Sequence, residues 1–353
     1  MLARVTAGRG HRLSEPLWYR RAEVWTIRTD ERDLMRAMNI DAQVATRNPD
    51  FDDGLVVWAD QYSGRYRPVA YGGQFDDQWR LFLERKRGFH NHTGVEVSDL
   101  YIDDRIFELT GVRGVIERPK WGSLYPMVAA WRHYTGNDDR RGVGGRLYLK
   151  PSFPIDYFAS KRCLDLGCGA GRWTKTLMAL GAKVTSVDIS EHALKSTARF
   201  NSDVRRLDIF DLPKHPELHN AFDFTLCWGV VMCTHDPKRA FEYVASTVKP
   251  GGSLYMMVYA PTYHSSDAVR DMRRRFHREC QTIESKIQFT FDVAQHPDNA
   301  INYLDMLNTF YNWTIPEEVI HGWYRQSEFS DVVTLNRHEQ NNCAWHVLGR
   351  KMA

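Results

Sequence analysis

Three glycines and one aspartate form the pattern in this sequence that is best suited to binding a ligand. The segment LDLGCGAGR, at 164–172, places Gly167, Gly169 and Gly171 between a strand-like run and a helical run. Glycines in such a turn let the backbone approach a ligand without a Cβ in the way. Asp188 ends the next strand-like run, where a carboxylate can accept hydrogen bonds from both ribose hydroxyls of a nucleoside. The pattern therefore predicts a loop that binds a nucleoside cofactor.

The spacing of these glycines separates two kinds of cofactor. A dinucleotide-binding fingerprint reads G-x-G-x-x-G, and its third glycine would fall at position 172. This chain has Arg172 there, and the third glycine comes one residue earlier. The G-x-G-x-G pattern after Leu-Asp favours a cofactor without a pyrophosphate, such as S-adenosylmethionine. A tight turn without a ligand is the alternative, and the flanking strand, the helix and Asp188 argue against it.

The segment LDLGCGAGRWTKTLMALGAKVTSVDIS, at 164–190, resembles the first two motifs of class I S-adenosylmethionine-dependent methyltransferases. The family pattern continues through LDIFDLP at 207–213, FDFTLCWGVV at 222–231 and VKPGGSLYMMV at 248–258. Near the C-terminus, EVIHGWYRQSEF resembles the E-V-x-x-W-F-x-x-A-G-F helix of the family, with one extra residue and with Glu328 in place of glycine. FDDQW, at 75–79, resembles a lid segment of methyltransferases from sugar and natural-product pathways.

The resemblance implies that S-adenosylmethionine is the cofactor, and it assigns the contacts. The three glycines pass beside the methionine portion, and Asp188 holds the ribose. Asp208 meets the adenine amino group, with a plain turn aspartate as the alternative for that residue. Asp165 helps to position the glycine loop or the amino-acid end. The complete set of implied cofactor-binding residues is Asp165, Gly167, Gly169, Gly171, Asp188, Ile189, Asp208, Ile209 and Trp228.

Methyl transfer from a sulfonium is an in-line displacement, and it needs a base only when the nucleophile arrives protonated. In an open α/β sheet, candidate bases lie after the carboxyl ends of the strands. His235 follows the fourth strand-like run and His264 follows the fifth, so both are candidate catalytic residues, with a solvated loop histidine as the alternative for each. Many small-molecule members read G-V-L-H-H after the fourth strand. Here Gly229-Val-Val-Met-Cys replaces the histidines, so none carries over to Met232 or Cys233.

Aromatic residues crowd the same rim, and four of them are the candidate acceptor-binding residues: Tyr259, Tyr263, Tyr311 and Trp313. Packing between the sheet and the segments that cover it is the alternative. Arginines at 273–275 and 278 are interpreted as a solvated helix face rather than as a site for an anionic substrate group. His90 and His92 have no third ligand at a recognisable spacing, so no metal site is predicted.

Strand-like and helical runs alternate between residues 151 and 259, which predicts a parallel sheet with helices on both faces. The predicted strands are 162–166, 183–187, 204–207, 222–228 and 253–259, and the predicted helices are 171–180, 191–200 and 237–248. Lys249-Pro-Gly-Gly is expected to end the last helix as a turn. Two final antiparallel strands, at 332–335 and 344–348, would complete a Rossmann-like α/β fold with a seven-stranded, mostly parallel sheet.

The chain is predicted to divide near residue 150. Residues 1–150 are expected to form an N-terminal extension or lid region, and residues 151–353 the methyltransferase domain. Within that domain, 262–327 are expected to be a helical cap insertion after the fifth strand.

Several helices are expected outside the alternating region. Two are predicted in the N-terminal extension, at 75–86 and 98–109, and the glycine-rich segment 135–145 is the best linker candidate. Apolar residues from Val269 to Ile287 recur at three- and four-residue steps, which predicts a buried helix stripe. Thr314-Ile-Pro-Glu-Glu is expected to open another helix, with a capping residue before the proline.

The composition excludes several classes of protein. Among 353 residues, 43% are hydrophobic and 26% charged, as in ordinary globular proteins, and the net charge of +3 gives no global case for nucleic acid as a partner. No run approaches the ~18 apolar residues of a membrane helix, and the N-terminus lacks a secretory h-region. Six scattered cysteines without a CxxC pair predict reduced thiols in a cytoplasmic protein. A homodimer is left open.

The leading interpretation is an enzyme that methylates a small molecule, in a biosynthetic pathway. An RNA or protein methyltransferase is the first alternative. It would be expected to show a basic face or a binding module, and the N/D-P-P-Y/F tetrad of base-amino methyltransferases is absent. A catalytically idle, cofactor-binding subunit is the second alternative. The intact glycines and Asp188 argue against lost binding, but they do not prove turnover.

Overall fold

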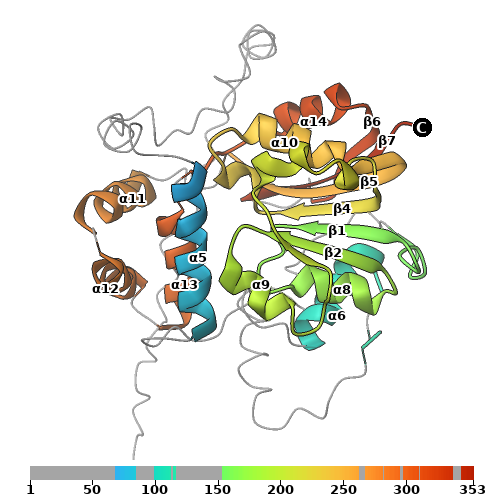
Figure 1. The fold of residues 1–353 in the computed structure, drawn as a ribbon. Coiled ribbons are helices and arrows are strands. Elements are labelled where there is room, and N and C mark those ends of the chain that lie inside the picture. Colours follow the sequence, from blue (N-terminus) through green and yellow to red (C-terminus); the bar gives the residue numbers. More distant parts are fainter. Residues whose placement is uncertain are drawn as a thin grey trace, which may run out of the picture. The chain divides into compact units, whose positions relative to one another are not determined.

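Seven strands pair into one mixed sheet in the order β3-β2-β1-β4-β5-β7-β6. The first five strands pair in parallel, and β7 runs antiparallel to both β5 and β6. This arrangement confirms the predicted α/β fold with its antiparallel final strand (Figure 1). The strands are β1 (Arg162–Leu166), β2 (Lys183–Asp188), β3 (Val204–Arg206), β4 (Phe222–Trp228), β5 (Val248–Tyr259), β6 (Phe329–Thr334) and β7 (Ala344–Lys351).

The computed structural model describes residues 68–84, 99–112, 114–116, 153–261, 267–280, 282–294, 297–309, 311–336 and 343–353. All of these residues lie within Asp41–Ala353, one of the two compact units of the chain. The linker predicted at 135–145 lies outside the described residues.

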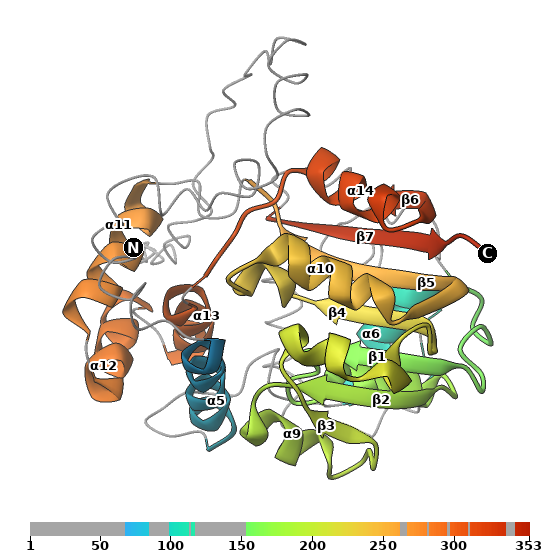
Figure 2. The same cartoon turned by 45° about the horizontal axis from the view of Figure 1, so that its top comes forward.

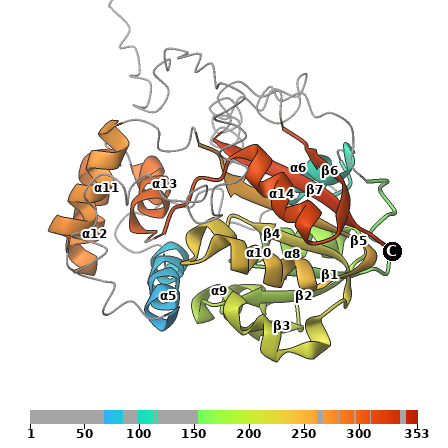
Figure 3. The same cartoon turned by 90° about the horizontal axis from the view of Figure 1, so that it is seen from above.

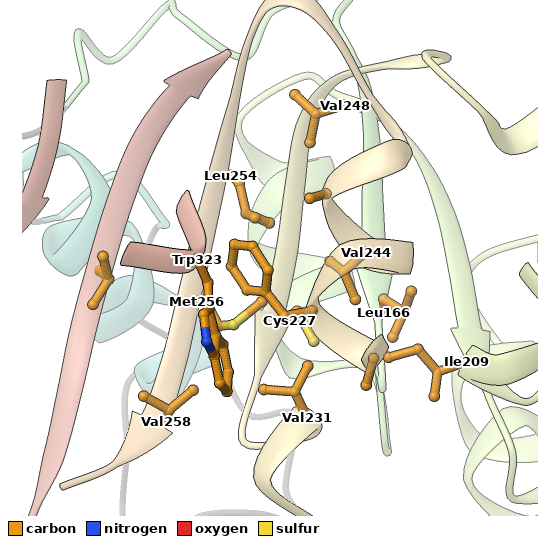
Figure 4. Packing of buried hydrophobic residues seen from close by; sticks show 14 of the residues in the cluster. Leu166, Ile209, Cys227, Val231, Val244, Val248, Leu254, Met256, Val258 and Trp323 are labelled. Carbon is orange, nitrogen blue, oxygen red and sulfur yellow. The ribbon is translucent and has the colours of Figure 1, made fainter. Parts of the chain in front are cut away.

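Helices cover both faces of the sheet, because neighbouring side chains of each strand point to opposite faces and both sets are apolar. Cys163 of β1 packs in the hydrophobic cluster that includes α6 (Asp99–Thr110) and α8 (Arg172–Ala179). Leu164 and Leu166 pack in the opposite cluster, which includes α10 (Pro237–Ser246) and α14 (Glu317–Gln326). Figure 3 shows the helices around the sheet, and Figure 4 shows the second cluster, with Leu166 and Trp323 among its buried side chains.

The strand order reverses between β1 and β4, and this reversal fixes where a ligand can bind. From β1 the chain passes through α8 to β2, β2 leads through α9 (Glu191–Thr197) to β3, and both strands lie on one side of β1. Strands β4 and β5 lie on its other side. The connections that leave β1 and β4 therefore diverge, which opens a crevice at their carboxyl ends.

Four further helices form a separate apolar cluster. They are α5 (Pro68–Glu84), α11 (Asp267–Glu279), α12 (Ile283–Ala294) and α13 (Pro297–Asn308). Leu81 and Phe82 of α5 are buried in this cluster together with Phe276, Ile287 and Leu304 of the other helices. Figure 2 shows α5 beside α13, although more than two hundred residues separate them in the sequence. The segment between β5 and α14 thus contains three described helices, and they pack with a helix from the N-terminal part of the chain.

The expectation that Lys249-Pro-Gly-Gly forms a turn at the end of a helix is wrong. Helix α10 ends at Ser246, and Thr247 is its C-terminal cap. Strand β5 already begins at Val248, which pairs with Phe222, and the register then shifts before Ser253 pairs with Phe224. Proline and glycine are tolerated in a strand where the ladder is interrupted, so the motif forms an irregular segment of β5.

Other helices also differ from the predicted patterns. The apolar stripe from Val269 to Ile287 runs over two helices, α11 and α12, which pack on a shared cluster. Helix α14 has Pro316 at its N-cap position and no side-chain cap, so Thr314 does not cap it. Helix α5 begins at Pro68 and not at Phe75, since proline suits a first helical turn. Helix α6 agrees with the prediction to within one residue at each end.

Candidate cofactor and acceptor site

The glycine loop follows β1, and its backbone lies in close contact with the neighbouring side chains of Val230 and Trp79. Gly167 has a φ of 74°, and a Cβ there would lie 2.1 Å from a methyl carbon of Val230. Gly169 has a φ of 54°, and a Cβ there would lie 2.4 Å from the Trp79 ring. Both positions therefore exclude a side chain, for conformational as well as steric reasons. Gly171, at a φ of 90°, provides the left-handed residue from which α8 starts.

Asp188 joins the end of β2 to the glycine loop. Its carboxylate accepts hydrogen bonds from the backbone N–H of Gly169 and from that of Ser190, each at 2.8 Å. Burial raises the pKa of Asp188 to about 6, against the opposing effect of these hydrogen bonds. A carboxylate oxygen has more than one lone pair, so this side chain retains capacity to accept from a ligand hydroxyl.

Asp165 is set behind the loop and not in front of it. The Thr174 hydroxyl donates to its carboxylate at 2.6 Å, and the residue is almost fully buried. Burial raises the pKa of Asp165 to about 7. Because Asp165 does not line the cavity described below, its contacts favour positioning of α8 and the glycine loop over contact with the amino-acid end.

A cavity of about 330 Å³ opens in front of the glycine loop. It gathers most of the predicted cofactor residues, together with one predicted acceptor residue: Gly167, Gly169, Asp188, Ile189, Asp208, Ile209, Trp228 and Tyr259. Asp208 stands at the start of a 3-10 helix, Ile209–Lys214, where it accepts from the Phe210 N–H at 3.0 Å. The carboxyl ends of β1, β2, β4 and β5, together with the connection after β3, thus form one continuous ligand-binding surface.

Three other predicted residues lie together but do not line this cavity. The His235 ring stacks on Phe210 with ring centroids 4.1 Å apart, and Tyr311 lies 6.4 Å from it. Trp313 stacks parallel to Tyr311, and its indole N–H donates to the Thr234 carbonyl at 2.8 Å. This group is therefore next to the Asp208 end of the cavity. His264 and Tyr263 lie outside the described residues.

Two walls of the cavity come from residues that sequence reasoning did not assign to the site. Helix α5 contributes Phe75, Gln78, Trp79 and Phe82, and the end of α13 contributes Asp305 and Thr309. The FDDQW segment was a usable signal for the first wall. The second wall had no comparable signal, because α13 is placed by packing on α5 and α12 and carries no motif.

Two absences hold for the part of the chain that the structure describes. No group of three or more histidine, cysteine, aspartate or glutamate side chains is arranged to hold a metal ion there. No helix in that part is both long and apolar enough to cross a membrane.

The methyltransferase domain family matches residues 164–256, which contain the end of β1, the glycine loop, Asp188 and strands β2 to β4. These residues form a class I S-adenosylmethionine-dependent methyltransferase domain. The match ends within β5, so the helices that wall the cavity, α5 and α13, lie outside it.

Curated relatives of the methyltransferase domain include two ubiquinone biosynthesis O-methyltransferases. Those of Marinobacter nauticus and Aromatoleum aromaticum are each 32% identical to this chain, over 106 and 109 residues. Each alignment covers 28% of this chain, and they cover 44% and 43% of the relatives. The chain therefore spans less than half the length of these relatives.

Among solved structures, a S-adenosylmethionine-dependent methyltransferase from Thermotoga maritima, titled a possible histamine N-methyltransferase, is similar to the methyltransferase domain. It is 17% identical, the superposition covers 54% of this chain and 82% of that chain, and the TM-score is 0.37. At that score the superposition adds nothing to the assignment, which rests on the family match and the strand order.

The cofactor of the methyltransferase domain is S-adenosylmethionine, and the residues present fit it. Gly167 and Gly169 line the cavity with backbone that carries no side chain of its own, which suits the methionine portion. Asp188 presents a buried carboxylate to the cavity, suited to a ribose diol. Asp208 and Ile209 offer a polar and an apolar group side by side, suited to an adenine ring.

Proposed function

We propose that this protein transfers the methyl group of S-adenosylmethionine to a small-molecule acceptor, in a biosynthetic pathway. The observation that carries this proposal is the aromatic wall over the cofactor loop. Phe75, Trp79 and Phe82 of α5 line the same cavity as the glycines and Asp188, and Trp228 and Tyr259 face it from the sheet. An acceptor that reaches the cofactor must share a cavity of about 330 Å³ with it, which favours a small molecule over a folded macromolecule.

The bound cofactor supplies an activated methyl group on a positively charged sulfur. The protein's own part is to align the acceptor with that carbon and to exclude water. The glycine loop, Asp188 and Asp208 line the cavity from the sheet side. The aromatic side chains of α5 line the same cavity and can hold a flat apolar acceptor, because aromatic faces pack well on such groups.

Cofactor binding is tested by calorimetric titration with S-adenosylhomocysteine. We expect wild type to bind it and Asp188→Ala to bind at least about tenfold more weakly, since a hydrogen bond to a charged group contributes about 1.5–3 kcal/mol. Asp211→Ala is the matched control, because Asp211 is close in the fold, forms an ion pair with Lys214 at the surface and does not line the cavity. Undiminished binding by Asp188→Ala would contradict the assignment.

The acceptor class is tested by incubating the protein with cofactor carrying a labelled methyl group and a fractionated metabolite extract. We expect label in a small-molecule fraction. Label in RNA or protein would support an RNA or protein methyltransferase instead. Binding of the cofactor without any transfer of label would support a catalytically idle, cofactor-binding subunit. The O-methyltransferase names of the two curated relatives favour a hydroxyl acceptor.

A further inference from the structure

Three carboxylates line the cavity within the described residues, and the cofactor accounts for two of them. Asp188 and Asp208 belong to the ribose and adenine positions, whereas Asp305 has no place in that scheme. Asp305 lies on α13, opposite the sheet, and its surface remains accessible while its neighbours Leu304 and Leu307 are buried. The Asp305 carboxylate therefore lines the cavity without a role in the cofactor contacts assigned above.

A chain of hydrogen bonds holds Asp305 in a defined orientation. The Gln78 amide N–H donates to the Asp305 carboxylate at 2.6 Å. Gln78 itself is buried, and its amide oxygen accepts from the Asn308 side chain at 3.3 Å. The Asn308 amide oxygen in turn accepts from the Lys286 ammonium at 3.2 Å. The chain crosses α5, α13 and α12, so it fixes which atom of Gln78 faces Asp305.

Two other groups that line the cavity interact electrostatically with Asp305. Arg172 of α8 is electrostatically coupled to it from the glycine-loop side. Cys233 is coupled to it from Val231–Cys233, the short 3-10 helix after β4.

The thiols and the guanidinium among the described side chains of the cavity do not suit a base. Burial raises the pKa values of the Cys168 and Cys233 thiols far above neutrality, so both stay protonated. Arg172 is a cation and cannot accept a proton. The cavity lining contains no histidine among the described residues.

We propose that Asp305 is a catalytic residue that takes the proton of the acceptor nucleophile, and that the acceptor is therefore a hydroxyl or a protonated amine. In the step, a lone pair of the acceptor oxygen, or of the amine nitrogen once its proton has passed to Asp305, forms a bond to the methyl carbon. The carbon–sulfur bond breaks, and its electron pair stays on sulfur, which becomes a neutral thioether. The acceptor proton passes to the Asp305 carboxylate, which later releases it to water. Gln78 is a positioning residue for that carboxylate. This inference rests on the proposed function.

The test compares two cofactor analogues and needs no acceptor. S-adenosylhomocysteine lacks the methyl group, whereas sinefungin carries an amine on the carbon that replaces the methylated sulfur. The sinefungin ammonium thus marks the region of the transferred methyl group, and a carboxylate near that region would pair with it. We expect Asp305→Asn to weaken sinefungin binding at least tenfold and to change S-adenosylhomocysteine binding by less than twofold. Asparagine keeps an acceptor oxygen for Gln78, and unchanged S-adenosylhomocysteine affinity would show that the variant is folded.

Asp292→Asn is the matched control, because Asp292 is an exposed carboxylate on the adjoining helix α12, paired with Gln288. It should change neither affinity. An equal loss of both ligands in Asp305→Asn would place Asp305 at the amino-acid end that both share, and would overturn the inference. Unchanged binding of both would overturn it as well. If the wild-type protein binds neither ligand, the proposed function itself is wrong. That result differs from a wild type that binds both ligands and an Asp305→Asn variant that does not behave as expected.

Discussion

Asp188 must accept hydrogen bonds as an anion at a position where burial disfavours its charge. The residue is 7% exposed, and burial raises its pKa to about 6 although two backbone N–H groups donate to it. Asp165, behind the glycine loop, has its pKa raised to about 7 for the same reason. The loop thus keeps two acidic groups whose charge changes close to neutral pH.

Binding of S-adenosylhomocysteine should therefore weaken as the pH falls through about 6. The ionised form of Asp188 accepts from the ribose hydroxyls, and the fraction ionised drops below the pKa, so the dissociation constant should rise by up to about tenfold per pH unit there. Above about pH 7 it should be constant. Calorimetry between pH 4.5 and 8 measures this, and Asp188→Asn should show weaker binding with a flat profile. A variant with the same pH dependence as wild type would assign the effect to another group.

The cofactor-binding part of the site could be predicted from the sequence, because the residues that form it are close in sequence. Gly167, Gly169 and Asp188 follow two adjacent strands, and strand geometry alone brings their carboxyl ends together. Asp305 could not be predicted in this way. It reaches the cavity through contacts between α5 and α13, segments that no spacing rule relates. His235 follows a strand as expected, yet its ring stacks on Phe210 outside the cavity.

At the scale of elements, one side chain of α5, Asp76, connects this helix to the segment that follows β2. Asp76 accepts from the Ser190 hydroxyl at 2.9 Å and from the His192 N–H at 3.1 Å, and it pairs with the His192 ring at 3.0 Å. Burial raises the pKa of Asp76, but the hydrogen bonds from His192 and Ser190 outweigh that effect and leave it below its usual value. Asp76 thereby connects α5 to the start of α9, and Trp79 of the same helix contacts Gly169.

Asp76→Ala should loosen α5 and speed the release of S-adenosylhomocysteine about three- to tenfold. Each lost hydrogen bond contributes about 0.5–1.5 kcal/mol, and the packing of Leu81 and Phe82 still holds the helix. Stopped-flow tryptophan fluorescence measures the release rate, and hydrogen exchange measures the protection of α5. The neighbouring Asp77→Ala is the control, since Asp77 is exposed and forms an ion pair with Arg80 on its own helix. Equal effects of the two variants would contradict a connection through Asp76.

Elements were predictable where one periodicity ran without interruption. The bounds of β1 and β4 agree fully with the sequence pattern, because each is a short apolar run between clear breaks. The pattern failed at Lys249-Pro-Gly-Gly, where proline and glycine mark an irregularity within β5 instead of a turn. It also failed at the stripe from Val269 to Ile287, because apolar spacing continues across the break between α11 and α12.

For the folded molecule as a whole, the antiparallel edge depends on how α14 sits on the sheet. Tyr324 is fully buried, and its hydroxyl donates to the Val347 carbonyl of β7 at 3.0 Å and to the Leu254 carbonyl of β5 at 3.3 Å. The Tyr324 ring lies against Gly349, where a Cβ would come within 2.5 Å of a ring carbon. Because Gly349 has no side chain, the Tyr324 ring of α14 can pack directly against the backbone of β7.

Two substitutions of glycine by alanine should change the stability in opposite directions. Gly349→Ala should lower the free energy of unfolding by about 1–3 kcal/mol, because the extra methyl group overpacks a filled site under Tyr324. Gly322→Ala should raise it by about 0.5–1 kcal/mol, because Gly322 is inside α14 and a Cβ there would meet nothing within 4 Å. Urea unfolding with an unchanged m-value measures both. Neither residue lines the cavity, so S-adenosylhomocysteine affinity should stay as in wild type. A stabilising Gly349→Ala would show that α14 can shift away from the sheet without cost, and the edge formed by β6 and β7 would then not depend on this contact.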